Sequence, residues 1–278
     1  MTRLLHIEAS PMKTLSHSID VAKQFLDAYR AAHPNHEIDT IDLWSQNIDL
    51  PEFDADMIGA KFAVLRTQTA TPEQRAQWQR AVALSQRFNA ADHYLFSVPM
   101  WNFGVPYRLK HFIDVVTLPG QNWNWSPATG YQALLSGKKA ALIYASAGAY
   151  AAHTEGASES PDDFQKPYLR RWLRFLGIED VTEISAAPTL TAPDLLAATK
   201  ADAKARAAAL GAAFWDARLP AGLTANQSVS NMVTLLRLTP CLPAAASPSP
   251  STSSPCLPAQ RGRCRLRSLR AAWERTRR

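Results

Sequence analysis

The sequence PMWNFGVP, residues 99–106, separates two segments with different hydrophobic patterns. The apolar run HYLFSV at 93–98 precedes it and is typical of a buried strand, and the amphipathic YRLKHFID at 107–114 follows it and is typical of a helix. Prolines at both ends restrict the backbone, and Pro106 suits the first turn of a helix. In an open parallel sheet, such a strand-to-helix turn lies at the carboxyl edge, where ligands bind. Its indole, phenyl and amide groups suit a flat ligand, and they equally suit a loop that packs on its own sheet.

Strand-like and helical patterns alternate on both sides of this stretch. Besides the run at 93–98, we predict strands at 3–9, 37–43, 140–145 and 181–186. We predict helices from 19 to 33, near 55–65, and at 71–89, 106–117, 167–176 and 193–218. Thr71, followed by Pro72, is a clear helix start, and Gly177 is a helix stop. The fold class is therefore α/β: a flavodoxin-like, doubly wound, five-stranded parallel sheet of order 2-1-3-4-5 with helices on both faces.

Residues 118–136 interrupt this alternation with short strand-like runs, and we expect them above the same carboxyl edge. Trp123 and Trp125 in this excursion could line a substrate pocket from a partner subunit. They could equally pack an interface without contacting substrate.

The charge of the chain is uneven along its length. Residues 219–278 contain nine arginines, no lysine and one acid, so they contribute +8 to the chain's total of +6, and residues 1–218 carry −2. A bulk basicity that would indicate nucleic-acid binding is therefore absent from residues 1–218. Because residues 219–278 are rich in proline, serine, alanine and arginine, we expect a disordered tail after a single domain at 1–218.

Cysteine usage and hydropathy limit the compartment of the protein. All three cysteines (Cys241, Cys256 and Cys264) lie in the tail, so residues 1–218 have neither a disulfide framework nor a thiolate metal site. No apolar run approaches the length of a membrane-spanning helix, and the N-terminus is too short and strand-like for a signal sequence. We expect a cytoplasmic protein that binds no metal and no membrane.

The loop after the first strand, residues 10–18, is a candidate anion site. Ser10, Ser16 and Ser18 offer hydroxyl donors, and the following helix offers unpaired N–H groups and the positive end of its dipole. His17 could contact the same anion or could face solvent. The absence of GxGxxG and GxxxxGK[ST] argues against a Rossmann dinucleotide site and a P-loop. An ordinary serine-rich loop that caps a helix would have the same composition.

The sheet order brings this serine loop beside the aromatic turn, and the pair suits a flavin mononucleotide. The phosphate would lie on residues 16–18. The ring would lie along Met100, Trp101, Asn102 and Phe103, with Ser146, Ala147, Gly148 and Ala149 on its other edge. Backbone N–H groups near Asn102, Phe103 and Gly148 could bond the polar edge of the ring.

With these motifs in place, the chain resembles the FMN-dependent NADH-azoreductases, also called NADH:quinone oxidoreductases. The resemblance runs from residue 3 to about 217 and is carried by Ser10 with SHS at 16–18, PMWNFGVP with YRLKHFID, GKKAALIYASAG at 137–148 and PYLRRWLRFLGIEDV at 167–181. That family usually has a Ser-Arg-Gly-Gly-like turn after its fourth strand, where this chain has Ser146-Ala147-Gly148-Ala149.

The resemblance implies a homodimer with one FMN per subunit, which NADH reduces and a quinone or azo compound reoxidises in a ping-pong reaction. It implies no particular catalytic residue, because the cofactor carries the chemistry. Two other functions stay open from sequence: a non-enzymatic flavin electron carrier or redox sensor, and a hydrolase with Ser10 or Ser146 as nucleophile. The hydrolase lacks a GxSxG elbow.

Overall fold

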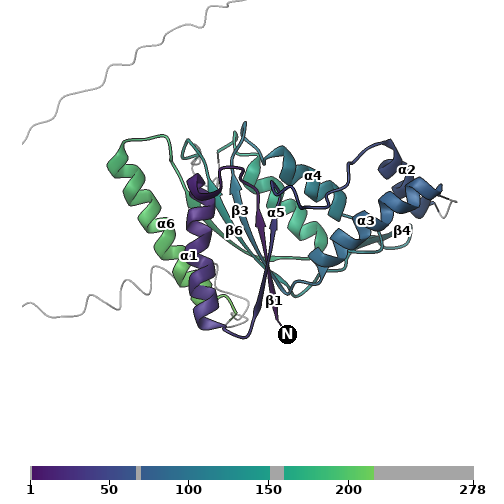
Figure 1. The fold of residues 1–278 in the computed structure, drawn as a ribbon, viewed down its shortest axis with the longest axis horizontal. Helices are drawn as coiled ribbons and strands as arrows, with labels where there is room; N and C mark the ends of the chain where they lie inside the picture. Colours follow the sequence, from purple (N-terminus) through teal and green to yellow (C-terminus); the bar gives the residue numbers. More distant parts are fainter. Residues whose placement is uncertain (1, 67–69, 151–159, 216–278) are drawn as a thin grey trace, which may run out of the picture. The chain divides into compact units, whose positions relative to one another are not determined.

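The computed structural model describes residues 2–66, 70–150 and 160–215. In this part of the chain, five parallel strands form one sheet with helices on both faces (Figure 1). The strands are β1 (Arg3–Glu8), β2 (Glu37–Asp42), β3 (His93–Pro99), β6 (Lys139–Ala145) and β7 (Asp180–Ala186), and their order is β2-β1-β3-β6-β7. Because β6 and β7 are the fourth and fifth strands of this sheet, the predicted order 2-1-3-4-5 is confirmed.

The helices begin and end where the sequence carries capping signals. α3 (Pro72–Asn89) opens with a capping box, in which Thr71 and Gln74 each accept a hydrogen bond from the other's backbone N–H. α5 (Gln165–Leu176) ends at Gly177, whose φ of 96° is left-handed. The remaining helices are η1 (Lys13–Leu15), α1 (His17–Ala32), α2 (Ala55–Leu65), α4 (Tyr107–Val116) and α6 (Pro193–Ala213).

The predicted end of the last helix near Arg218 was wrong. The helix α6 stops at Ala213, and the next residue, Phe214, turns into the core and packs edge-on against Phe25 with ring centroids 5.0 Å apart. A buried aromatic contact lies directly after the last residue of the helix.

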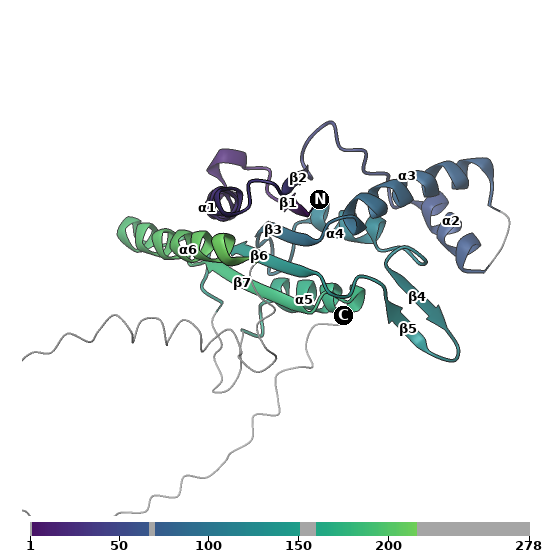
Figure 2. The same ribbon diagram turned by 90° about the horizontal axis from the view of Figure 1, so that it is seen from below.

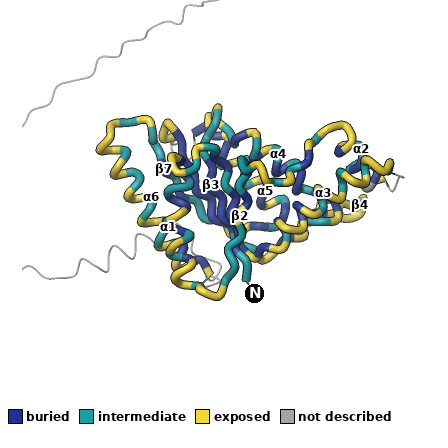
Figure 3. The backbone as a smooth tube through the Cα atoms, in the orientation of Figure 1, coloured by how far each residue is buried: buried dark blue, intermediate teal, exposed yellow. Residues whose placement is uncertain are grey.

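Each face of the sheet has its own apolar core. The central strands of the sheet consist mostly of buried residues (Figure 3). On β3, Tyr94, Phe96 and Val98 belong to the core shared with α3, α4 and α5, whereas Leu95 belongs to the core shared with α1 and α6. Figure 2 shows α1 and α6 together on one side of the sheet. The central strands are therefore buried on both faces, which is why they read as continuous apolar runs in the sequence.

The excursion after α4 forms a separate antiparallel hairpin of β4 (Trp123–Ser126) and β5 (Gly130–Ala133) (Figure 2). Its strand character is as predicted, but its predicted position above the carboxyl edge is wrong. Leu135 N donates a hydrogen bond to Leu176 O (2.9 Å), and the ring centroids of Trp123 and Phe175 lie 5.8 Å apart. Phe175 and Leu176 belong to the last turn of α5. Because a crossover helix runs antiparallel to the strands, that turn lies at the amino edge.

Trp123 is buried within its own chain and Trp125 is exposed. A role for either in a partner's pocket stays a prediction. The predicted tail at 219–278 lies outside the described residues, so its disorder and the domain boundary at 218 also stay predictions. Among the described residues, no helix combines the length and apolar character needed to cross a bilayer.

The helices α1 and α6 pack closely because small residues face α1. Ala203, Ala207 and Gly211 are buried at intervals of one helical turn on α6. A Cβ atom at Gly211 would lie 2.3 Å from Phe25 O, and no real contact of this kind is so short. Only glycine therefore fits at this crossing.

We predict that Gly211→Ala destabilises the protein by about 1–2 kcal/mol, because the overpacking cost exceeds the gain in helix propensity. Urea unfolding measures the change. Ala209→Met, which adds volume at an exposed position of the same helix, should leave stability nearly unchanged. A Gly211→Ala variant as stable as the parent would contradict the close approach.

His6 on β1 is a titratable group inside the sheet layer. Its Nε2 lies 3.1 Å from Ser97 Oγ, and its side chain is 1% exposed. Burial lowers the pKa of His6 to about 4, against an opposing influence from Asp42. The folded protein therefore keeps this imidazole neutral at a pH where the unfolded chain protonates it.

Stability should consequently fall as the pH drops from the ordinary histidine pKa of 6.5 toward 4, since the unfolded state binds the extra proton. His6 alone should account for about 2 kcal/mol between pH 7 and pH 5. We predict that His6→Gln reduces the pH dependence of the unfolding free energy by that amount, as measured by urea unfolding at both pH values. An unchanged dependence would contradict a buried neutral His6.

Candidate functional site

Three loops leave the carboxyl edge of the sheet side by side, and main-chain hydrogen bonds hold them together. Ala9 N donates to Ser97 O (3.0 Å), which joins the end of β1 to β3. Met100 N donates to Ala145 O (2.8 Å), which joins the end of β3 to β6. The loops at 10–18, 100–104 and 146–149 therefore start from neighbouring strand ends, as the sheet order predicted.

The serine loop places its hydroxyl groups at the start of α1. Ser16 is the N-cap and its Oγ accepts from Ile19 N (3.4 Å), while Ser18 Oγ lies 3.1 Å from Ser16 Oγ. Ser10 Oγ accepts from Met12 N (3.3 Å). The backbone N–H groups of His17 and Ser18 donate to no acceptor among the described residues, which leaves the helix end able to bind an anion.

The charged groups around this loop are mostly paired. Lys13 forms an ion pair with Asp42, and Asp20 pairs with Lys200 (2.9 Å) and Lys204 (2.8 Å) on α6. Burial lowers the pKa of His17, and the nearby Lys200 lowers it further while Asp20 opposes. A neutral His17 suits a role as a hydrogen-bonding group. Lys200 could not be predicted as a neighbour of this loop, because it lies far along the chain on α6.

The aromatic turn is a tight two-residue hairpin with unusual backbone angles. Trp101 N donates to Gly104 O (3.0 Å) and Gly104 N donates to Trp101 O (2.9 Å). The two central residues, Asn102 and Phe103, have φ of 45° and 70°, as in a type I′ turn. Asparagine tolerates this region, but a bulky phenylalanine is strained there. The N–H groups of Asn102 and Phe103 reach no acceptor in the part of the chain that the structure describes.

An aromatic cluster that the sequence reasoning missed supports this turn. Trp44, just after β2, lies 5.7 Å from Trp101 and 5.5 Å from Tyr107 between ring centroids. Its Nε1 donates to Ala9 O (3.0 Å), so it ties the end of β1 to the turn. The available signal was its position just after β2, which lies next to β1 and two strands from β3, at the same edge of the sheet.

The third loop follows β6, and hydrogen bonds from the segment just after β7 hold it in place. Thr189 N and Oγ1 both donate to Ser146 O (2.9 and 3.0 Å), and Leu190 N donates to Ala147 O (3.2 Å). Ser146 Oγ donates to Gly148 O (2.7 Å). Ala147, Gly148 and Ala149 are left exposed at the edge.

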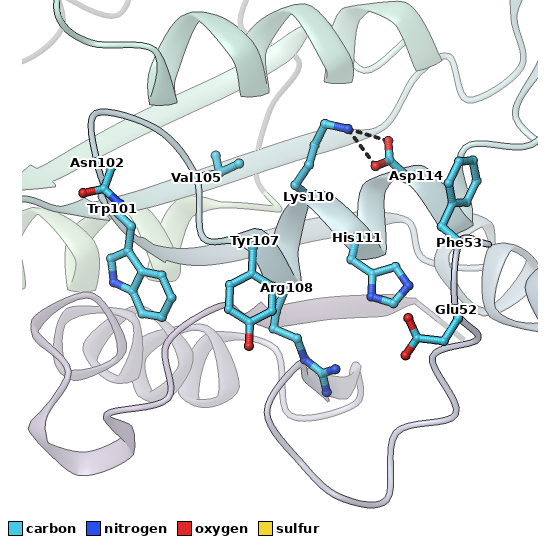
Figure 4. A pocket seen from close by; sticks show the side chains of 10 residues that line it. All are labelled: Glu52, Phe53, Trp101, Asn102, Val105, Tyr107, Arg108, Lys110, His111 and Asp114. Atoms are coloured by element: carbon cyan, nitrogen blue, oxygen red, sulfur yellow. Dashed lines mark hydrogen bonds and ion pairs between the residues drawn. The ribbon is translucent and has the colours of Figure 1, made fainter.

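A hollow of about 800 Å³ lies on the α4 side of the aromatic turn (Figure 4). Of the predicted site residues only Trp101 and Asn102 line it, and the serines do not. The other lining residues come from α4 and from the segments before α2 and α4: Glu52, Phe53, Val105, Tyr107, Arg108, Lys110, His111 and Asp114.

The described residues give no support for two other kinds of site. Neither Ser10 nor Ser146 hydrogen-bonds a histidine within the described part of the chain, and His6 instead meets Ser97, which is fully buried. Among the same residues, no cluster of three or more His, Cys, Asp or Glu could hold a metal ion.

The sheet order and the position of these loops define a flavodoxin-like α/β protein. A family model described as Flavodoxin-like fold matches residues 2–210. An FMN-dependent NADH:quinone oxidoreductase of Burkholderia lata is 45% identical over 190 residues, which cover 68% of this chain and 89% of the relative. Another of that name from Desulfotalea psychrophila is 43% identical over 191 residues, 69% of this chain and 87% of the relative.

A solved structure adds a similarity of fold at lower sequence identity. The structure of an FMN-dependent NADH-azoreductase from Bacillus anthracis in complex with FMN is 28% identical, with a TM-score of 0.65 over 76% of this chain and 100% of that chain. The chain belongs to the family of flavodoxin-like FMN-dependent NADH:quinone oxidoreductases.

The stability of variants in the aromatic turn tests whether its backbone is strained at Phe103. We predict that Phe103→Gly raises the unfolding free energy by about 1 kcal/mol, because relief of the strain at positive φ exceeds the added chain entropy. Asn102→Gly is the matched control and should change stability little, since asparagine tolerates this region. Thermal and urea unfolding measure both, and a destabilised Phe103→Gly would contradict a strained turn.

Proposed function

We propose that this protein is an FMN-dependent oxidoreductase that passes electrons from NADH to quinones and aromatic azo compounds by a ping-pong mechanism, with one FMN per subunit. The observation that carries the proposal is the meeting of an anion-binding helix end and an aromatic turn at one edge of a flavodoxin-like sheet. Membership of a family whose curated relatives bear this activity in their names supports it.

The serine loop fits the phosphate end of FMN. The hydroxyls of Ser10, Ser16 and Ser18 and the free N–H groups at the start of α1 would bind the phosphate. His17, whose pKa burial and Lys200 lower, would donate a hydrogen bond to the phosphate. The dipole of α1 offsets the phosphate charge, so no arginine is needed.

The aromatic turn and the loop after β6 fit the flavin ring. Met100 and Trp101 would wall the ring, and the N–H groups of Asn102, Phe103 and Gly148 would face its polar edge. Bound FMN supplies the hydride-accepting and hydride-donating chemistry. The protein positions flat substrates over the ring, excludes water with Trp44, Trp101 and Tyr107, and offers N–H donors to negative charge on the ring edge. Ser146, Ala147 and Ala149 would complete the rim.

We further propose a cytoplasmic homodimer. Large apolar side chains are exposed around the carboxyl edge, which a second copy would cover. They are Met12, Leu15, Phe103, Phe164 and Leu190. Light scattering should give twice the mass of the chain.

Purified protein should be yellow, its flavin absorbance should bleach on addition of NADH, and a quinone should restore it. Protein that stays colourless after incubation with FMN would contradict the proposal, and bleaching without turnover would favour an electron carrier.

Ser10→Ala combined with Ser18→Ala should weaken FMN binding at least about tenfold through the lost hydrogen bonds. Ser45→Ala, in the neighbouring loop after β2, is the control and should bind FMN normally.

A further inference from the structure

The hollow beside the aromatic turn carries one positive charge, that of Arg108, for which the described residues supply no counter-charge. We propose that this hollow binds the anionic substituent, a carboxylate or a sulfonate, of a flat aromatic electron acceptor, and that Arg108 selects for it. The inference rests on the proposed function, because the acceptor's reacting part would lie at the turn.

Arg108 is held in place without using up its charge. Its Nε donates to Leu43 O (2.9 Å), and its guanidinium lies 5.7 Å from the centre of the Trp44 ring. No carboxylate forms an ion pair with it among the described residues. The side chain is partly buried, so its charge is less screened than a fully exposed one. The donors at its two terminal nitrogens therefore remain for a ligand, in the fork geometry that matches a carboxylate or sulfonate.

The other charges that line the hollow do not compete for an anion. Lys110 Nζ contacts both carboxylate oxygens of Asp114 at 2.7 Å, so this pair is neutral within itself (Figure 4). His111 Nε2 is 2.9 Å from Pro51 O and donates to it. Glu52 is the one further charge, and it is exposed, so solvent screens it. Arg108 and Glu52 should thus act in opposite directions on the affinity for an anion.

The walls of the hollow suit an aromatic body that extends from the turn. Trp101, Tyr107 and Phe53 contribute rings, and Val105 contributes apolar surface. Its volume of about 800 Å³ is within the range of small-molecule sites. Because Trp101 and Asn102 belong both to this hollow and to the turn, a molecule over the turn can continue into the hollow. An acceptor with an aromatic ring and a terminal anion matches this arrangement.

The test compares two acceptors of the same shape, azobenzene-4-carboxylate and azobenzene-4-carboxamide, with the FMN-loaded full-length protein. The ratio of their kcat/KM values cancels general losses of activity. Arg108→Gln should lower the ratio of kcat/KM for the carboxylate to kcat/KM for the carboxamide about tenfold. Arg108→Lys should lower this ratio less. Glu52→Gln should raise the ratio. Arg174→Gln, which removes an exposed charge near the end of α5, is the matched control and should not move it.

A binding measurement separates this inference from the proposed function. Isothermal titration with 2-naphthoate, a flat anion that is not an electron acceptor, should give a dissociation constant that rises about tenfold in Arg108→Gln and rises with added salt. Binding that depends on Arg108 in a protein without reductase activity would sustain the site and overturn the proposed function. If Arg108→Gln changes neither the acceptor ratio nor the affinity for 2-naphthoate, the proposed anion site is wrong. An effect of Arg108→Gln confined to the KM for NADH would also contradict it.

Discussion

The parallel pairing of β1 with β3 is the constraint on which the site depends. This pairing sets Glu8 opposite Ser97, and the bond from Ala9 N to Ser97 O extends it to the point where both chains leave the sheet. The serine loop and the aromatic turn therefore begin at the same height on adjacent strands. A shift of one residue would reverse the faces of β1 and bring His6 into the opposite apolar core. Fold and site are thus fixed by the same main-chain bonds.

The backbone of the aromatic turn is strained, and hydrogen bonds within the turn and from α5 keep it in this conformation. Two hydrogen bonds between Trp101 and Gly104 close the turn, and Phe164 N donates to Phe103 O (2.9 Å) from the start of α5. The positive φ angles of Asn102 and Phe103 keep their N–H groups out of the sheet ladder. Strain of this kind persists where the surroundings over-determine the backbone, and it is concentrated at functional sites. Here it offers two donors at the place where a flavin ring would need them.

Most of the fold could be predicted from the sequence because the signals are local. The buried strands are continuous apolar runs, Thr71 and Gly177 mark helix ends, and strand–helix alternation allows few topologies. The hairpin at Trp123 was misplaced because a strand pattern does not say at which edge of the sheet it lies. Trp44 and Arg108 were missed because their roles come from contacts across the sheet edge, between residues far apart in the chain. The end of α6 was misjudged because the Phe25–Phe214 contact is tertiary.

The proposed FMN site places opposite ends of one ligand on two loops, with the phosphate on the serine loop. The most direct measurement is a fluorescence titration of flavin-free protein with FMN and with riboflavin, which lacks the phosphate. FMN should bind at least about 100-fold more tightly, because several charge-assisted hydrogen bonds at the start of α1 would be lost with riboflavin. Equal affinities for the two flavins would contradict the phosphate site, and with it the assignment of the edge between β1 and β3.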